Sequence, residues 1–162
     1  ARITTFLDPD ADPLGDGWNI TQSLIAIGSG GWVGKGYKAP DSQNALGFLP
    51  HTIVHNDFIF SVMGEQHGFL GGLILVCAFT ILFLLMLGVA MQAEDDLGRL
   101  LATGITMLLF THTFMNLGMT ISITPINGLT LTLVSYGGSF VMITMLSFAL
   151  LQSIWIYRRT LR

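Results

Sequence analysis

Two long stretches of this sequence contain no charged side chain. Residues 66–93 and 100–157 lack Asp, Glu, Lys and Arg altogether. A helix needs about 20 apolar residues to cross the roughly 30 Å hydrocarbon core of a bilayer. The first stretch is long enough for one such helix and the second for two. The sequence therefore predicts an all-α, polytopic helical membrane protein with three spans, near residues 68–92, 99–122 and 139–157.

The overall composition agrees with a membrane protein. Hydrophobic residues make up 51% of the chain and charged residues only 10%, against about 25% charge in an ordinary soluble domain. The net charge of -3 and the scattered basic residues argue against a nucleic-acid partner. Cys77 is the single cysteine, so an internal disulfide is excluded.

The basic residues predict the orientation in the membrane. The tail "YRRTLR" at residues 157–162 is the one cationic cluster and directly follows the last span. The positive-inside rule places this end in the cytoplasm. Counting back through the spans, the turn at 93–98 is cytoplasmic, whereas residues 1–65 and the loop 123–138 lie on the outer face.

The outer portion, residues 1–65, has turn signals throughout but also one helical pattern. The segment "WNITQSLIAIG" carries an apolar helical face after an N-cap at Asp16 or Asn19, which predicts a short helix on the membrane surface. The helical spacing after Asp57 predicts that the next helix begins there and rises above the bilayer before entering it.

The membrane portion, residues 66–162, contains one segment that cannot span. Residues 123–138 are apolar but are interrupted by Pro125 and several glycines. Non-helical backbone at membrane depth is tolerated only where it is buried in protein or lines a watery cavity. We therefore expect a re-entrant loop that lines a cavity.

Three motifs occur in a familiar order: "FLDPDADPLGDGWNITQSLIAIGSGGWVGKGY", "HNDFIFSVMGEQHGFLG" and "PINGLTLTLVSYGGS". Together they resemble the long periplasmic loop and the last three helices of the SEDS family, which includes RodA, FtsW and SpoVE. "FLDP" and "GKGY" are similar to the RodA branch. The chain departs from the family pattern at His51 and Asn56, where an acid and a threonine are usual, and a proline is missing near Thr130 or Thr132.

The resemblance implies a ten-helix protein of the bacterial inner membrane, of which this chain is the C-terminal two-fifths. The polar N-terminus without an initiator Met fits a chain that starts in mid-protein. The implied activity is an inverting peptidoglycan glycosyltransferase that polymerises lipid II into glycan strands for cell elongation and shape. Its implied ligands are lipid II and undecaprenyl-diphosphate-linked glycan. The implied partners are a class B penicillin-binding protein and membrane lipids. No cofactor is certain and a divalent cation stays open. We expect residues 1–162 alone to be inactive.

Three alternative functions remain open at this point. One is the division-type, FtsW-like glycosyltransferase, and another is a transporter or flippase of lipid-linked precursors. A transporter needs ionisable residues or broken helices near the bilayer midplane, whereas the acids here gather at the outer rim. The third is a scaffold for the partner synthase, which predicts that the acid of the HNDF motif is dispensable.

Asp57 in that motif matches the essential acid of the family. Joining two sugars through a 4-hydroxyl requires a base that takes the proton while a diphosphate leaves the other sugar, and a carboxylate at the membrane edge suits this role. The alternative is an N-cap carboxylate that binds helix amides.

Lys35, His55 and Glu65 are the charged or titratable candidates for substrate binding. Lys35 lies in a glycine-rich loop, where backbone and ammonium group can approach a diphosphate. His55 is two residues from Asp57 and suits a tuning role. On a continuous helix Glu65 would lie about 12 Å further along the axis than Asp57. It faces either the same cavity or a basic residue in the missing half of the protein.

Ser135, Gly137 and Gly138 of "SYGGS" are candidate cavity-lining residues, followed by Ser139 as the expected cap of the last helix. His112 and Asn116 share one face of the second span and are expected to bond a neighbouring helix, with no chemical role. His51, His55 and His67 cluster in the sequence, but their spacing matches no zinc pattern, so no metal site is assigned.

Overall fold

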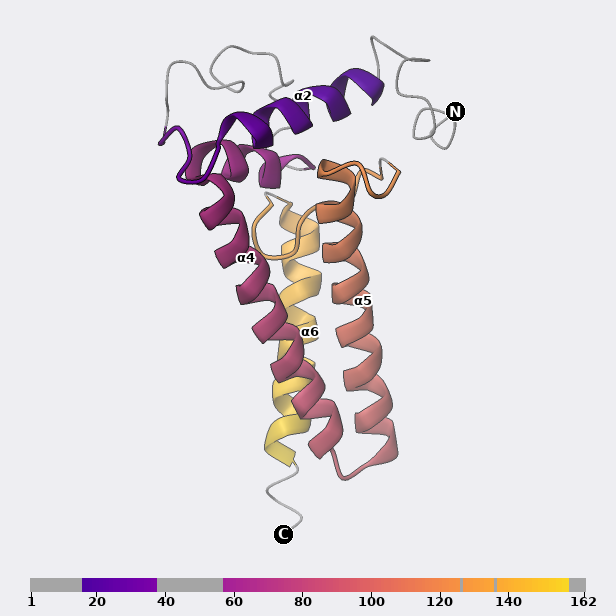
Figure 1. Ribbon diagram of the computed structural model, residues 1–162. Coiled ribbons are helices and arrows are strands. Elements are labelled where there is room, and N and C mark those ends of the chain that lie inside the picture. Colours follow the sequence, from indigo (N-terminus) through magenta and orange to yellow (C-terminus); the bar gives the residue numbers. More distant parts are fainter. Residues whose placement is uncertain (1–15, 38–56, 126, 136, 158–162) are drawn as a thin grey trace.

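The computed structural model describes residues 16–37, 57–125, 127–135 and 137–157. These residues form helices and connecting segments and contain no strand. Figure 1 shows the arrangement, with one helix lying across the top of three long ones. The helices are α2 (Asp16–Ser29), α4 (Ile59–Gln92), α5 (Asp96–Thr120) and α6 (Gly138–Tyr157).

The helices α4, α5 and α6 are each long and apolar enough to cross a membrane. They run down, up and down in turn, with a short turn between α4 and α5 and a longer loop between α5 and α6 (Figure 1). A core joins all three helices and consists of Met86, Ala90, Ala102, Leu109 and Leu151. The predicted all-α class with three candidate spans is therefore confirmed.

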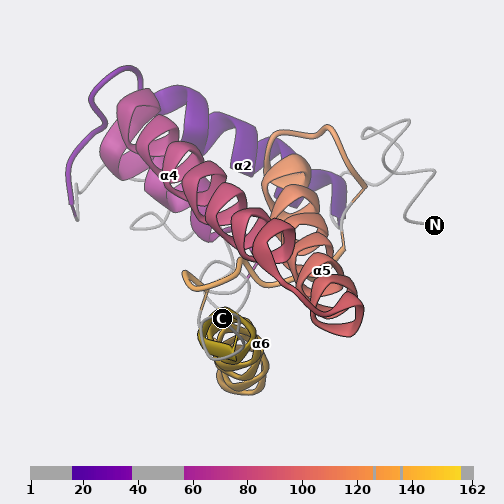
Figure 2. The same cartoon turned by 90° about the horizontal axis from the view of Figure 1, so that it is seen from below.

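Helix α6 packs more loosely than the other two. Thr144 and Leu151 are its buried residues, and Figure 2 shows it standing apart from the group formed by α2, α4 and α5. Its remaining apolar side chains, such as Met142 and Leu146, face outward. An apolar face of this kind suits contact with lipid or with further helices.

Helix α2 is the short helix expected in the outer portion. It begins at Asp16, so that Asn19 lies inside the helix rather than at its cap. Ser23 of α2 is fully buried, and its Oγ lies 2.6 Å from Ser61 Oγ of α4. The same hydroxyl group donates to the carbonyl oxygen of Thr120 at 2.8 Å. One serine therefore connects α2 to the beginning of α4 and the end of α5.

Helix α4 is broken at Gly68, where the backbone has φ 66° and ψ -164°. The turns before Gly68 lie across the top of the bundle, and the rest of α4 runs down through it (Figure 1). In a regular helix the amides of Phe69 and Leu70 would bond to the carbonyls of Glu65 and Gln66. The break separates these four groups, and each one needs a new partner.

The glycine-rich loop, residues 30–36, supplies all four partners. Its amides donate to the two carbonyl groups before the break, and its carbonyls accept from the two amides after it. The bonds are Lys35 N to Glu65 O at 2.9 Å, Gly36 N to Gln66 O at 3.1 Å, Phe69 N to Gly31 O at 2.8 Å and Leu70 N to Trp32 O at 3.2 Å.

Glycine is required where this loop meets the break. Gly34 has φ 86°, and a Cβ there would lie 2.6 Å from the amide nitrogen of Gly68. A Cβ on Gly68 would in turn lie 2.7 Å from the amide nitrogen of Val33. Both contacts involve backbone atoms, which cannot move aside cheaply. The two glycines therefore allow the backbone of the loop to pack directly against the backbone of α4 at its break.

Candidate active site

Asp57 lies immediately before the N-cap of α4. That cap is Phe58, which is 2% exposed, and its carbonyl oxygen accepts from the amides of Ser61 at 3.0 Å and Val62 at 3.3 Å. No side-chain capping bond closes this helix end. Within the described residues, the carboxylate of Asp57 therefore does not serve as a helix cap.

The carboxylate of Asp57 faces the α5–α6 loop, residues 121–137. A Cβ built on Gly128 of this loop would lie 3.5 Å from Oδ2 of Asp57. Asp57 itself is partly exposed. The glycine thus leaves the carboxylate room beside the main chain of the loop, at the end of the bundle where α4 begins.

Partial burial changes the acidity of this group. Loss of hydration raises the pKa of Asp57 above its usual value, because desolvation disfavours the charged form. A raised pKa makes the carboxylate a stronger base when it is ionised. That is the direction of change useful for general-base chemistry near neutral pH.

Asn116 of α5 holds Asp57 and the α5–α6 loop together. Its Nδ2 donates to the backbone carbonyl oxygen of Asp57 at 3.1 Å, and also to the carbonyl oxygen of Leu129. The side chain is fully buried. Sequence reasoning assigned Asn116 no chemical role, although an amide inside a charge-free span was a visible signal.

The loop is attached to α5 at further points. Thr124 donates through Oγ1 to the carbonyl oxygen of Met115 at 3.1 Å, and Thr113 Oγ1 bonds to Thr132 Oγ1 at 3.2 Å. Leu131 and Thr132 are fully buried. In Figure 1 the segment between α5 and α6 dips back toward the bundle. Its depth in a membrane stays a prediction.

Ser135, Gly137 and Gly138 lie where this loop becomes α6. Ser135 Oγ accepts from the amide of Leu131 at 2.8 Å and is buried. The carbonyl oxygen of Gly137 accepts from the amide of Val141 at 2.9 Å, which makes Gly137 the N-cap residue. The expectation that Ser139 caps this helix is therefore wrong, because Ser139 lies inside its first turn.

Lys35 and Glu65 are brought together by the glycine-rich loop. Lys35 Nζ lies 3.3 Å from Oε1 of Glu65, whose side chain is 1% exposed. Within the described residues, Glu65 thus pairs with a lysine of this chain. Asp57 precedes the helix that holds Glu65, so the two acids do not share one continuous helix. Their role in substrate binding stays a prediction.

The histidine candidates are only partly placed. His51 and His55 lie outside the described residues, and His67 is exposed on α4. No group of three potential metal ligands occurs among the residues that the structure describes.

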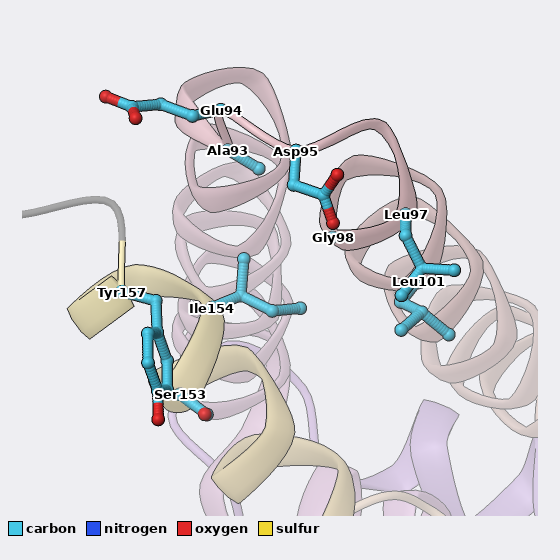
Figure 3. Close-up of a pocket in the computed structure, with 9 residues that line it drawn as sticks. All are labelled: Ala93, Glu94, Asp95, Leu97, Gly98, Leu101, Ser153, Ile154 and Tyr157. Carbon is cyan, nitrogen blue, oxygen red and sulfur yellow. The ribbon is translucent and has the colours of Figure 1, made fainter. Parts of the chain in front are cut away.

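A cavity of about 220 Å³ lies at the other end of the bundle. It is formed by the α4–α5 turn and the end of α6, with Glu94 pointing outward and Ile154 lying beneath the turn (Figure 3). Asp57 lies at the opposite end, where α4 begins (Figure 1). This cavity is therefore separate from the candidate active site.

The chain is similar in sequence to several proteins named peptidoglycan glycosyltransferases. It is 44% identical over 160 residues to peptidoglycan glycosyltransferase MrdB of Escherichia coli (strain K12), which covers 99% of this chain and 42% of that protein. It is 44% identical over 154 residues to peptidoglycan glycosyltransferase RodA of Treponema pallidum (strain Nichols), a match that covers 94% of this chain and 35% of that protein. A probable peptidoglycan glycosyltransferase FtsW of Geobacter sp. (strain M18) is 40% identical over 153 residues, a match that covers 94% of this chain and 41% of that protein.

A solved structure has the same fold. It is described as "Structural coordination of polymerization and crosslinking by a peptidoglycan synthase complex", with a TM-score of 0.76 and 28% identity, covering 98% of this chain and 41% of that one. The chain thus spans about two-fifths of the length of these relatives. The FtsW, RodA and SpoVE family model, described as "Cell cycle protein", matches residues 1–160, and the chain belongs to this family.

Proposed function

We propose that this chain is the C-terminal part of a RodA-type peptidoglycan glycosyltransferase that polymerises lipid II, with Asp57 as its general base. The observation that carries the proposal is the environment of Asp57. Its carboxylate is partly buried beside Gly128, its pKa is raised, and the N-cap position of the adjacent helix is Phe58 rather than Asp57. The carboxylate is therefore available to a substrate.

In the proposed reaction Asp57 takes the proton from the 4-hydroxyl group of the acceptor sugar. The hydroxyl oxygen forms a bond to the anomeric carbon of the donor sugar, and the bond from that carbon to the lipid diphosphate breaks. The configuration at carbon inverts, because the attack and the departure occur on opposite faces. A diphosphate is already a good leaving group, so one well-placed base accounts for the acid–base chemistry.

The other predicted site residues have supporting parts in this proposal. Ser135 and Gly137 hold the end of the α5–α6 loop, Gly138 begins α6, and we propose that the three line the substrate cavity. Lys35 and Glu65 hold the glycine-rich loop against the start of α4, and His55 is proposed to lie near the substrate. A divalent cation in the complete site stays open.

The proposed protein works in the bacterial inner membrane beside a class B penicillin-binding protein. The name of the solved relative, which joins polymerisation with crosslinking in one complex, supports such a partner. The outer end of the bundle, where Asp57 lies, would face the periplasm. The relatives include both RodA and FtsW proteins, and the "GKGY" motif favours the elongation type over the division type.

The test compares Asp57→Asn with the wild type in a full-length protein that contains this chain. Asparagine keeps the size of the side chain but removes its basicity, so polymerisation of lipid II should fall by about 10²-fold or more. Expression and partner binding should persist. An Asn variant with near-normal rate and strand length would show that Asp57 is not the base.

A further inference from the structure

Asn116 makes two hydrogen bonds, one to the main chain of the candidate base and one to the loop beside it. Its Nδ2 donates to the carbonyl oxygen of Asp57 at 3.1 Å and to that of Leu129, which adjoins Gly128 beside the carboxylate. Both partners are acceptors, so the amide nitrogen must face them. One side chain on α5 therefore fixes the main chain of the base and the main chain of the loop that it faces.

The other half of the Asn116 side chain is its carbonyl oxygen. Oδ1 of Asn116 is buried and has no hydrogen-bond partner among the described residues. A leucine of similar size would remove this unpaired atom, but it would also leave the carbonyl groups of Asp57 and Leu129 without their donor. Both bonds that the side chain does make go to main chain at or beside the candidate base, which is the placement expected of a residue that serves the site.

We propose that Asn116 is a positioning residue that sets the distance between the Asp57 carboxylate and the acceptor hydroxyl. The inference rests on the proposed function, because it assumes that Asp57 is the base. Asn116 touches main-chain groups and not the reacting atoms, so it acts through Asp57. A displacement of the base by about 1 Å is enough to lower the rate about 10²-fold.

The first test measures kcat and KM for lipid II in the full-length protein with its partner. Asn116→Leu should lower kcat by about 10²-fold and leave KM within about threefold, since the loss affects the reaction step rather than binding. Asn116→Gln keeps the donor on a longer side chain and should retain more activity than the Leu variant.

Thr113→Val is the matched control. It removes the buried bond from α5 to Thr132 of the same loop, one turn away from Asn116, without touching Asp57. Its kcat should stay within about threefold of the wild type. Equal losses of kcat in the Leu and Val variants, or a change in KM alone, would overturn the positioning role.

A second test needs no catalysis. Asp57→Cys is introduced in a Cys77→Ser background, and its alkylation by a water-soluble maleimide is timed with and without Asn116→Leu. The rate should change by about threefold or more in the Leu variant, because the main chain at residue 57 is released. It should stay constant with Thr113→Val.

The two tests separate the inference from the proposed function. If Asp57→Asn keeps its activity, the base assignment fails, while the alkylation rates still report whether Asn116 holds residue 57 in place. An alkylation rate that Asn116→Leu leaves unchanged would overturn the inference, whatever the activity of Asp57→Asn.

Discussion

Lys35 binds Glu65 through both its side chain and its backbone. The ammonium group lies 3.3 Å from Oε1, and the amide of Lys35 donates to the carbonyl oxygen of Glu65 at 2.9 Å. The acid is buried, whereas the lysine is 27% exposed. An ion pair and a backbone bond between the same two residues thus fasten the glycine-rich loop to the broken helix α4.

Removing the charge of Lys35 should destabilise the protein. Lys35→Met leaves the buried carboxylate of Glu65 without the lysine cation. The free energy of unfolding should fall by about 3 kcal/mol, the low end of the range for breaking a buried ion pair, because Lys35 is partly exposed. The melting temperature in detergent should fall. The double variant Lys35→Met/Glu65→Gln should recover part of the loss, and a double variant less stable than Lys35→Met would contradict a pairwise interaction.

Gly68→Ala should disrupt the break in α4. A Cβ at this position meets the backbone of Val33 and requires a positive φ that alanine rarely adopts. We expect a lower melting temperature and faster proteolysis within residues 30–36. Gly88→Ala is the control, since a Cβ there meets nothing within 4 Å. Similar melting temperatures for the two variants would argue against the tight junction.

The raised pKa of Asp57 predicts the acid limb of the activity profile. The base must be ionised, so kcat should fall as the pH decreases through the pKa of Asp57. Because burial raises that pKa, the midpoint should lie above the usual aspartate value. Measurement at saturating lipid II, with folding checked at each pH, tests this. A midpoint at or below the usual value would contradict the assignment.

The same shift has a consequence for stability. A carboxyl group whose pKa is higher in the folded state favours folding at low pH, and this contribution disappears as the pH rises through the folded-state pKa. At neutral pH, Asp57→Asn should therefore leave the melting temperature unchanged or raise it slightly. A clear drop at neutral pH would mean that the carboxylate makes a stabilising interaction in the fold.

The orientation predicts opposite labelling of the two ends of the bundle. In a Cys77→Ser background, Val33→Cys replaces a side chain that is 75% exposed in the glycine-rich loop, and Glu94→Cys lies in the exposed α4–α5 turn. A membrane-impermeant thiol reagent should label the first in intact cells and the second only after permeabilisation. The reverse pattern would invert the topology.

Charge distribution by itself determined the class of this protein. Residues 66–93 and 100–157 have no charged side chain, and a bilayer admits few structures besides apolar helices. The spans therefore followed from the sequence, and the predicted start of the first one at residue 68 coincides with the break in α4. The candidate base also followed, from the HNDF motif.

Only the tertiary structure decided which residues surround that base and what the charged neighbours do. Asp57 and Asn116 are 59 positions apart, and Lys35 and Glu65 are 30 apart, so no helical or strand period connects either pair. These contacts depend on the broken helix, which lays the first turns of α4 across the bundle. That break requires close backbone contact between Gly68 and Gly34. Such a contact between distant segments is determined by tertiary packing rather than by any local sequence pattern.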